Sequence, residues 1–441
     1  DAGNEKAVKQ LRARKRRPHK PLAVMLPQTG ADGCDAVRRV ALASERELAL
    51  LRDPRRPIVL CRARADNGLA PSIAPSLQAL GLFLPYSPLH HLILDAFGGP
   101  LVATSGNISG EPVLTEPSEA ERRLSAVADG FLHHNRPIRR PADDSVYRVI
   151  ADRGRPLRIG RGVAPLELAL STELAEPILA VGGHMKNTVA LGWRNRVVVS
   201  PHIGELDRPR SQAVFAQVIE DLQRLYGVQA KHIVYDAHPN YASTRWARSQ
   251  SLPATKVYHH HAHASAVWGE FNVGDDILVF TWDGTGYGED GNIWGGEGLY
   301  GRPGAWQRMT SLRPFRLPGG DKAGREPWRS AAALCWETGR EFAQAPAGAE
   351  LALQAWQRRI NSPVSTAVGR LFDAAGSLLE LCHYASFEAQ GPMMLEAFLE
   401  ECDLQAPPLP LFVDKAGVLC ADWQAALIVL LDSKMVWKYV R

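Results

Sequence analysis

The sequence predicts an α/β protein with more than one domain. Apolar stretches of strand length alternate with stretches of helical periodicity along the chain, an order typical of α/β folds. The chain has 441 residues, more than one hydrophobic core usually serves, so we expect two or three domains. Six cysteines are scattered without a CxxC pair, which excludes a zinc ribbon or a disulfide framework and fits a reducing cytoplasm.

Charge and hydropathy narrow the class of protein further. Lys and Arg number 51 against 47 Asp and Glu, and the resulting net charge of +4 does not by itself indicate a nucleic-acid binder. The excess gathers in the basic segment 12–17, where we expect any anionic partner, although such runs are commonly solvated faces. No apolar run reaches the ~18 residues that span a bilayer, and residues 1–5 resemble neither a signal nor a transit peptide. The sequence therefore predicts a soluble cytoplasmic protein without a membrane partner.

The first 165 residues or so have the alternating pattern of one α/β domain. The patterns predict a polar helix over 5–17, a strand over 22–26, a helix over 36–51, a strand over 57–61, a turn and helix over 81–94, and a strand over 99–103. The loop 104–110, with sequence TSGNISG, follows the last strand. Its Ser and Asn side chains and glycine backbone can hold phosphate oxygens, because glycine lets main-chain N–H groups approach closely. The same composition is also typical of an ordinary polar turn.

Two stretches of this domain match the signature of a known family. The KRRP sequence at 15–18 with KPLAVM at 20–25, and the TSGN sequence at 104–107, resemble the KxR…SxN signature of the YrdC family. Members of that family bind ATP and build carbamoyl-type adenylates. They begin with a strand and a glycine-rich turn, which we do not find before the first predicted helix.

The YrdC resemblance implies a nucleotide site in this domain. It assigns the binding of ATP to Lys15, Arg17, Ser105, Asn107, Arg158 and Arg161. Residues 139–146 lie where a substrate-facing loop is expected. Adenylate formation expels pyrophosphate, so Lys and Arg must neutralise charge on several oxygens at once, with Mg²⁺ accompanying the ATP.

A second region begins after a polar linker that we predict at 171–177. Its patterns predict a three-stranded antiparallel meander over 178–183, 188–192 and 196–200, an amphipathic helix over 212–226, a strand over 232–236, a helix over 243–249 and a short strand over 255–258. This order is similar to one lobe of the actin-like, or ASKHA, ATPase fold. We therefore expect a YrdC-like, twisted open-sheet α/β domain over 1–168 and an incomplete actin-like two-lobe α/β domain over 176–441.

Four histidines gather within five positions, at His259, His260, His261 and His263. If the run opens a helix, His259 and His263 lie one turn apart on one face and can bind one cation, whereas the other two point elsewhere. The apolar run 277–282 ends at Asp283 in a glycine-rich loop, and this carboxylate is the natural third ligand. Histidines at this spacing are also common as solvated or hydrogen-bonded residues, and an Asp before Gly commonly caps a turn.

Motifs along nearly the whole chain resemble the HypF carbamoyltransferases of NiFe-hydrogenase maturation. They are KNT at 186–188, SPHIGEL at 200–206, HHHAH at 259–263, DGTGYGEDG at 283–291, LPGGD at 317–321, REPWR at 325–329, GRLFD at 369–373 and SFEAQG at 386–391. The resemblance implies a divalent metal, iron or zinc, held by His259, His263 and Asp283 beside a nucleotide. We do not find the family's fourth ligand, a late aspartate, or its acylphosphatase-like and zinc-finger domains, so we expect an internal piece or a truncated gene product.

This second resemblance implies an ATP-dependent carbamoyltransferase. The family forms carbamoyl adenylate from carbamoyl phosphate and ATP. It then transfers the carbamoyl group to the carboxyl-terminal cysteine of HypE, where the group becomes the cyanide ligand of the hydrogenase. We expect His259, His263 and Asp283 to catalyse this transfer.

Three alternative interpretations stay open at this point. An antibiotic-type O-carbamoyltransferase has similar modules in the opposite order. A nucleic-acid-binding module is a different class, because YrdC-like proteins can present a basic face to double-stranded RNA. No aromatic side chains interleave with the basic run 12–20, however, which argues against a nucleic-acid partner. A truncated, non-catalytic protein that still docks its partner is the third interpretation.

Overall fold

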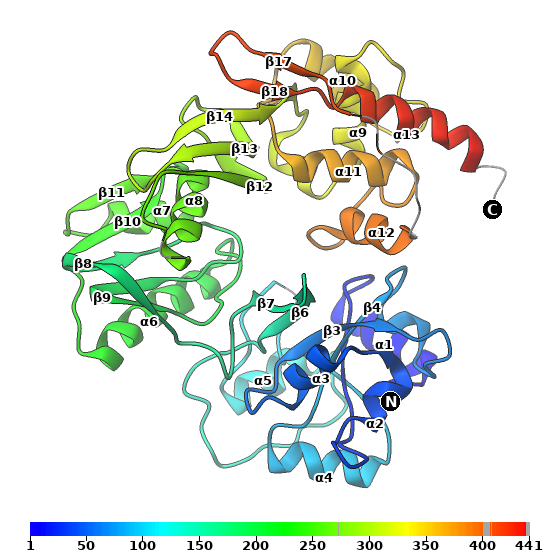
Figure 1. Ribbon diagram of the computed structural model, residues 1–441. Coiled ribbons are helices and arrows are strands. Elements are labelled where there is room, and N and C mark those ends of the chain that lie inside the picture. Colours follow the sequence, from blue (N-terminus) through cyan, green and yellow to red (C-terminus); the bar gives the residue numbers. More distant parts are fainter. Residues whose placement is uncertain (109, 272, 400–405, 407, 438–441) are drawn as a thin grey trace. The chain divides into compact units, whose positions relative to one another are not determined.

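The computed structural model describes residues 1–108, 110–271, 273–399, 406 and 408–437 (Figure 1). The chain forms two compact units, Asp1–Thr255 (unit 1) and Lys256–Arg441 (unit 2). Both units mix helices and strands, which confirms the predicted α/β class. Each described helix is too short or too polar to cross a membrane.

The first sheet of unit 1 is mixed, with the spatial order β5-β1-β4-β3-β6-β7 and with β2 paired to β3. Its strands are β1 (Ala23–Met25), β2 (Ala41–Leu42), β3 (Ile58–Ala63), β4 (Ala79–Phe83), β5 (Leu101–Ala103), β6 (Val146–Ile150) and β7 (Arg153–Arg158). β1 runs parallel to β4, and β3 runs parallel to β6. The pairs β1–β5, β3–β4 and β6–β7 are antiparallel. Because β1 and β5 are neighbours, segments 80 residues apart in the chain lie side by side in this sheet.

The helices around this sheet follow local capping signals. They are α1 (Glu5–Lys15), α2 (Asp35–Val40), α3 (Glu45–Arg52), the 3-10 turn η1 (Pro71–Ile73), α4 (Pro88–Phe97) and α5 (Pro117–Leu124). The predicted continuous helix over 36–51 is wrong, because β2 pairs with β3 and interrupts it. Ser44 then starts α3 with a capping box to Glu47. The capping sequence was visible in the chain, but the interruption depends on a strand that is distant in sequence.

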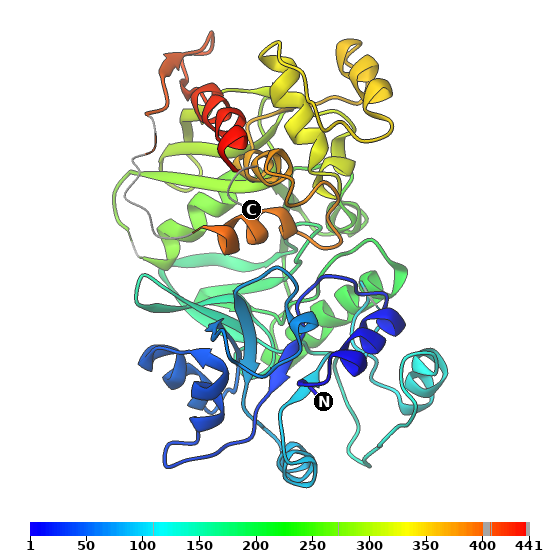
Figure 2. The same ribbon diagram turned by 90° about the vertical axis from the view of Figure 1, so that its right-hand side faces the viewer.

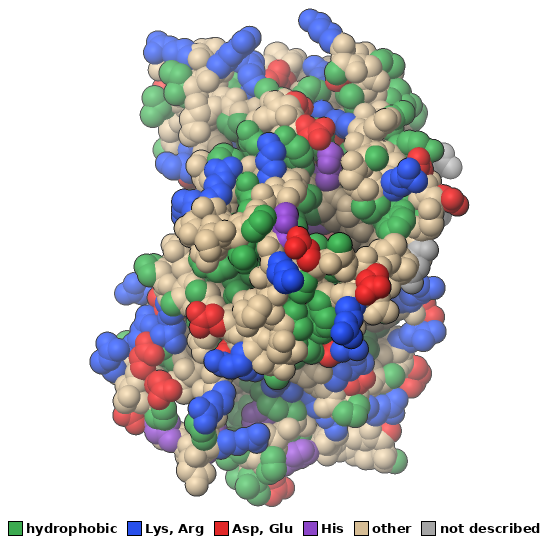
Figure 3. Space-filling view, turned by 90° about the vertical axis from the view of Figure 1, so that its left-hand side faces the viewer, with side chains coloured by type: hydrophobic (Ala, Val, Ile, Leu, Met, Phe, Trp, Pro, Cys, Tyr) green, Lys and Arg blue, Asp and Glu red, His purple; other side chains and the backbone are tan. Residues whose placement is uncertain are grey.

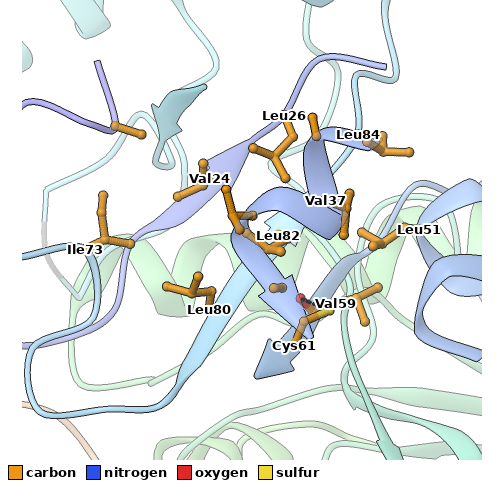
Figure 4. Close-up of a cluster of buried hydrophobic side chains, with 14 of the residues drawn as sticks. Val24, Leu26, Val37, Leu51, Val59, Cys61, Ile73, Leu80, Leu82 and Leu84 are labelled. Atoms are coloured by element: carbon orange, nitrogen blue, oxygen red, sulfur yellow. Dashed lines mark hydrogen bonds between the residues drawn. The ribbon is translucent and has the colours of Figure 1, made fainter. Parts of the chain in front are cut away.

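Buried aliphatic side chains fill the space between this sheet and its helices (Figure 4). Val24, Val59 and Leu82 come from three neighbouring strands and are 0% exposed. Val37 of α2 and Leu51 of α3 close the cluster from the helical side. Burial of each such side chain stabilises the fold by about 1.5–3 kcal/mol relative to leaving it in water. This cluster therefore fixes β1, which pairs with β5, the strand that the candidate-site loop 104–107 follows.

Arg12 ties α1 to the basic loop that follows it. Arg12 is 6% exposed, and its guanidinium donates to five backbone carbonyl oxygens. These are the oxygens of Ser72 (2.5 Å), Ile73 (3.1 Å), Arg17 (2.8 Å), Pro18 (3.1 Å) and Lys20 (3.1 Å). The planar, fully charged group satisfies carbonyls of two segments at once, which a lysine could not do. Arg12 is therefore a structural anchor for residues 17–20.

A second sheet in unit 1 has the order β11-β10-β8-β9. Its strands are β8 (Leu166–Ala180), β9 (Ala190–Val199), β10 (His232–Asp236) and β11 (Ala254–Val257), accompanied by α6 (Pro209–Tyr226) and α7 (Ala242–Arg248). The predicted linker at 171–177 is wrong, because these residues belong to β8, which pairs with β9 through two register shifts. The predicted three-strand meander is also wrong, because its two later strands form the single strand β9. The amphipathic helix over 212–226 is confirmed as most of α6.

Unit 2 is built on a sheet of order β15-β16-β13-β14-β18-β17, with β12 paired to β13. The strands are β12 (Ile277–Tyr287), β13 (Ile293–Gly301), β14 (Gln307–Leu312), β15 (Phe315–Arg316), β16 (Val364–Ser365), β17 (Leu411–Val413) and β18 (Leu419–Ala421). The helices are α8 (His259–Glu270), η2 (Gly320–Gly324), α9 (Trp328–Glu337), α10 (Ala349–Gln357), α11 (Val368–Leu378), α12 (Gln390–Phe398) and α13 (Gln424–Trp437). α9, α11 and α13 pack together (Figures 1 and 2), and α8 and α11 both contact β12.

Replacement of Arg12 by Met should destabilise unit 1. The methionine fills similar volume but removes five hydrogen bonds to backbone carbonyl oxygens, so we expect a loss of about 2–4 kcal/mol in the free energy of unfolding. Urea unfolding followed by circular dichroism measures this loss. The matched control is Arg14→Met on the same helix, because Arg14 is 30% exposed and pairs with the exposed Asp129. The control should lose less than about 1 kcal/mol, and equal losses in both variants would contradict the anchoring role.

Candidate active site

Helix α8 places two histidines of unit 2 side by side. The helix begins directly after β11, with Tyr258 as its N-cap residue, so His259 lies in the first turn. His263 follows one turn later on the same face, and the Nε2 atoms of the two rings are 3.2 Å apart. The prediction that the histidine run opens a helix is confirmed.

Asp283 completes a cluster with these two histidines. Its Oδ2 atom lies 3.0 Å from His259 Nε2 and 3.6 Å from His263 Nε2. All three ligand atoms lie within 4.8 Å of one another, and no other group of three His, Cys, Asp or Glu side chains in the described residues could hold a metal ion in this way. The structure thus brings together the three residues predicted as ligands, while their catalytic role stays a prediction.

An irregularity in β12 sets the position of Asp283. The predicted glycine-rich loop is wrong, because residues 283–286 belong to the strand itself. β12 pairs regularly with β13 up to Trp282 and again from Gly286, and it advances four residues between these points where β13 advances two. Such bulges bend a strand and change the direction of its side chains, often beside functional sites.

Gly286 lets α8 approach β12 closely. A Cβ atom at this position would lie 2.3 Å from His260 Cε1 and 2.8 Å from His259 Cδ2. His260 itself is fully buried and its ring lies 6.3 Å from that of Trp294. His261 lies at a similar distance from Trp294, 6.2 Å, with its Nδ1 atom 3.9 Å from a Glu289 oxygen. His260 and His261 therefore lie near Trp294, and neither belongs to the ligand cluster.

The charge state of Asp283 suits a residue that binds a cation. Burial alone would raise the pKa of its carboxyl group, but hydrogen bonds from His259 and His263 and from the Gly284 N–H outweigh burial and hold this pKa well below its usual range. The group is therefore an ionised carboxylate at neutral pH, with acceptor oxygens only.

The three residues fit a divalent transition metal. Two imidazole nitrogens and one carboxylate oxygen form a donor set that suits Zn²⁺ or Fe²⁺. Ligand atoms placed about 2.1 Å from a tetrahedral ion lie about 3.4 Å apart. The three separations in the cluster, 3.0, 3.2 and 3.6 Å, bracket that value. A shared ion would also relieve the crowding of these polar atoms.

In unit 1, the end of α1 meets the loop that follows β5. Lys15 Nζ donates to the Ser105 carbonyl oxygen at 2.6 Å, to Thr104 Oγ1 at 3.3 Å and to Asn107 Oδ1 at 3.4 Å. Ser105 Oγ donates to Asn107 Oδ1 at 2.8 Å. Three of the predicted nucleotide-binding residues are therefore in contact. Lys15 is only 8% exposed, and burial together with the charge of Arg17 lowers its pKa to about 8.

Arg17 extends this cluster toward β7. Arg16 ends α1 in the left-handed conformation, with φ of 49°, and this turn directs the chain into the loop anchored by Arg12. Burial, and then the charges of Arg12 and Arg158, lower the pKa of Arg17 to about 10, although Asp143 opposes them. Arg158 Nη1 lies 3.4 Å from Asp143 Oδ2. Arg17 and Arg158 therefore share one partly shielded carboxylate.

Arg161 has different partners from the other predicted nucleotide-binding residues. Its Nε donates to Asp144 Oδ1 at 2.9 Å, and its Nη2 donates to the carbonyl oxygen of Arg56 at 2.9 Å. The guanidinium carbon also lies 3.4 Å from the centre of the Tyr86 ring. These contacts account for Arg161 as a structural residue, and its nucleotide role stays a prediction.

One group that the sequence did not single out as a site residue also belongs to this positive region. His202, which is partly buried, donates its backbone N–H to the Ile159 carbonyl oxygen at 2.8 Å, next to Arg158. Burial, and then the charges of Arg158, Lys186 and Lys20, lower the pKa of His202 to about 4. His202 was visible only as part of the SPHIGEL motif, because its neighbours come from distant segments.

The positive region around Arg17 is local. The whole chain has a net charge of only +4. On the face shown in Figure 3, Lys and Arg side chains are intermixed with Asp and Glu side chains. Within this region Lys15 and Arg17 are both desolvated by burial, and a pair of desolvated cations suits an anion with several oxygens.

Family models match three successive parts of the chain. Residues 1–160 match the model of Sua5, YciO and YrdC proteins, described as "Telomere recombination". Residues 173–270 match the "HypF Kae1-like domain", and residues 279–435 match "Carbamoyltransferase, Kae1-like Domain, second subdomain".

Curated relatives match nearly the whole chain. Carbamoyltransferase HypF of Synechocystis is 39% identical over 449 residues, which cover 96% of this chain and 58% of the relative. Carbamoyltransferase HypF of Rhodobacter capsulatus is 41% identical over 427 residues, which cover 93% of this chain and 56% of the relative. The chain belongs to the HypF family. The relationship predicted from the motifs is thereby confirmed.

Solved HypF structures have the same fold over this region. Full-length HypF in the phosphate- and nucleotide-bound form is similar with a TM-score of 0.92 and 33% identity, over 99% of this chain and 57% of that chain. HypF of T. kodakarensis is similar with a TM-score of 0.89 and 29% identity, over 98% of this chain and 58% of that chain. The predicted order, a YrdC-like region followed by the HypF-type region, is confirmed. The chain spans less than three fifths of the length of these HypF proteins.

His202 should make unit 1 sensitive to acid. Its pKa is about 4 in the folded protein and near 6.5 when exposed, so only the unfolded chain binds a proton between these values. The contribution of His202 to the free energy of unfolding is therefore fully present above pH 6.5. It is lost as the pH falls toward 4, by up to about 3 kcal/mol. Urea unfolding at pH 7 and pH 4.5 should show a smaller acid loss in His202→Gln than in wild type. The exposed His134 provides the control His134→Gln, and an unchanged acid loss in His202→Gln would contradict the assignment.

Proposed function

We propose that this chain contributes two reaction sites of a HypF-type carbamoyltransferase. The site of unit 1 forms carbamoyl adenylate from carbamoyl phosphate, water and ATP, with release of inorganic phosphate and pyrophosphate. The site of unit 2 transfers the carbamoyl group to the carboxyl-terminal cysteine of HypE, for synthesis of the cyanide ligand of NiFe-hydrogenase. The observation that supports this proposal most directly is the convergence of His259, His263 and Asp283 in a chain whose relatives are named carbamoyltransferases.

The cations of unit 1 suit the adenylation step. Attack on the α-phosphate spreads negative charge over its oxygens while pyrophosphate leaves. Burial has already removed much of the hydration of Lys15 and Arg17, so their charges attract a phosphate more strongly than fully hydrated charges would. Ser105 Oγ lies beside them and can exchange its contact with Asn107 for a phosphate oxygen. The Mg²⁺ that accompanies ATP would further neutralise the triphosphate.

The residues of unit 2 suit the transfer step. A divalent metal held by His259, His263 and Asp283 would act as a Lewis acid that polarises the carbamoyl oxygen. α8 holds the two imidazoles one turn apart, so neither ring has to move to reach a shared ion. The Gly284 N–H holds Oδ1 of Asp283 at 2.5 Å, which leaves Oδ2 facing the histidines. The protein thus supplies a prearranged set of ligands.

The double substitution His259→Ala/His263→Ala should remove bound metal. We expect about one equivalent of zinc or iron in the wild-type chain and at least a tenfold weaker affinity in the variant, because two of three ligands are lost. Elemental analysis after dialysis measures the content, and competition with a chelator measures the affinity. His134→Ala, at an exposed position, is the control. Equal metal content in wild type and the double variant would reject the ligand assignment.

Lys15→Ala should weaken ATP binding by about 10–100-fold, because it removes one charge-assisted contact to phosphate. The same variant should abolish carbamoyl-phosphate-dependent exchange of pyrophosphate into ATP. Calorimetry measures the affinity and labelled pyrophosphate measures the exchange. A wild-type chain that binds ATP without any exchange would reject adenylate formation by this chain.

The pH dependence of ATP binding distinguishes the titration of Lys15 from the titration of neighbouring groups. With a pKa of about 8, Lys15 loses its positive charge as pH rises, so wild-type affinity should fall above pH 8. Lys15→Arg should keep most of its charge over this range and bind ATP with little change between pH 7.5 and 9.5. A parallel decline in both proteins would assign the titration to another group.

A further inference from the structure

The peptide that joins Asp283 to Gly284 is enclosed by neighbouring backbone. A Cβ atom at Gly295 of β13 would lie 2.6 Å from the Asp283 carbonyl oxygen. A Cβ atom at Gly369 of α11 would lie 2.8 Å from Gly284 Cα. Contacts this short are not found for real Cβ atoms, so only glycine allows β13 and α11 to pack here. The peptide therefore lies between a strand and a helix with almost no free space.

Arg370 of α11 holds the next peptide, which joins Gly284 to Thr285. Its Nε donates to the Gly284 carbonyl oxygen at 3.2 Å. Its Nη1 lies 2.7 Å from Asp373 Oδ2, on the same helix, and the two side chains are only 15% and 6% exposed. The guanidinium is thus fixed at one end by an ion pair and bound at the other to the backbone next to Asp283. Lysine has a single ammonium point charge and cannot make both contacts in this geometry.

Unit 2 contains a second arginine with the same kind of contacts. Arg316 Nε lies 3.2 Å from Glu337 Oε1, and Arg316 Nη1 donates to the Trp356 carbonyl oxygen at 3.2 Å. Its side chain is 25% exposed, and its guanidinium lies over the Trp356 ring. The carbonyl that Arg316 binds belongs to α10, which contributes no residue to the ligand cluster. A purely structural arginine of this kind is therefore available for comparison.

We propose that Arg370 is a positioning residue that fixes the Asp283 carboxylate for the divalent metal. The inference rests on the metal site of the proposed function. The Gly284 N–H holds Oδ1 of Asp283, so rotation of this peptide would move the carboxylate away from His259 and His263. Arg370 opposes that rotation indirectly, because it fixes the following peptide through the Gly284 carbonyl oxygen and so restrains Gly284, whose N–H holds the carboxylate. Neighbours that orient a ligand in this way typically change metal affinity by about 10–100-fold.

The test compares Arg370→Lys with Arg316→Lys in the full chain. The affinity for Zn²⁺ is measured by competition with a chromophoric chelator, and the thermal unfolding midpoint is measured on the same samples. Each variant loses one of the two contacts that its arginine makes, so both midpoints should fall. Only Arg370→Lys should raise the Zn²⁺ dissociation constant, by about 10–100-fold, whereas Arg316→Lys should stay within about threefold of wild type. An Arg370→Lys protein that binds Zn²⁺ within threefold of wild type overturns the proposal.

A second variant keeps the test decisive if Arg370→Lys does not fold. Asp373→Asn retains the size of the side chain but removes the charge that holds Arg370, so it should weaken Zn²⁺ binding by more than threefold. Wild-type affinity in this folded variant overturns the proposal. The failure of the metal site itself gives a different pattern. A wild-type chain that binds no Zn²⁺, or binds it as His259→Ala/His263→Ala does, rejects the site and the positioning role together. Loss in the histidine variant without loss in Arg370→Lys or Asp373→Asn rejects only the positioning role.

Discussion

The ligand cluster of unit 2 depends on backbone segments that approach more closely than a Cβ atom allows. Gly286 admits the histidine rings of α8, whereas Gly295 and Gly369 admit the peptide after Asp283. Each glycine lowers the conformational cost of an unusual approach but loses more entropy on folding than other residues, by roughly 0.5–1 kcal/mol relative to alanine. Such a concentration of glycine is costly for stability alone. It is consistent with a requirement that α8, β12 and α11 present their side chains to one point.

A different constraint acts in unit 1, where positive charge is withdrawn from water. Lys15 and Arg17 are partly desolvated, and the carboxylate of Asp143 opposes the lowering of the Arg17 pKa. Desolvated cations destabilise a fold unless carbonyl oxygens or anions compensate them. Carbonyl oxygens do so in part, since Lys15 donates to the Ser105 oxygen and Arg12 holds the following loop. The part of their lost hydration that the carbonyl oxygens do not replace is a source of binding energy for a phosphate anion.

The sequence predicted those features that depend on local spacing. His259 and His263 were predictable because one helical turn relates them, and the strand over 232–236 was predictable from its apolar run. The β2 strand and the long β8 arm were not, because both have a polar or helix-favouring composition and form only by pairing with the strand that follows each of them. Arg370 and His202 were missed as site residues for a related reason. Their roles arise from neighbours far away in the chain, and periodicity contains no information about such contacts.

The two sites differ in electrostatics in the way that the proposed half-reactions require. Adenylation must hold a polyanion and release pyrophosphate, so a region with several cations and one or two carboxylates is suited to it. Carbamoyl transfer must polarise one carbonyl group, for which a single divalent ion with two neutral imidazoles and one carboxylate leaves a local charge of about +1. A site with the many cations of unit 1 would bind such a metal weakly, because like charges repel. A site with the few charges of unit 2 would hold a triphosphate weakly. The separation of the two sites into different units therefore follows from the incompatible charge that each step demands.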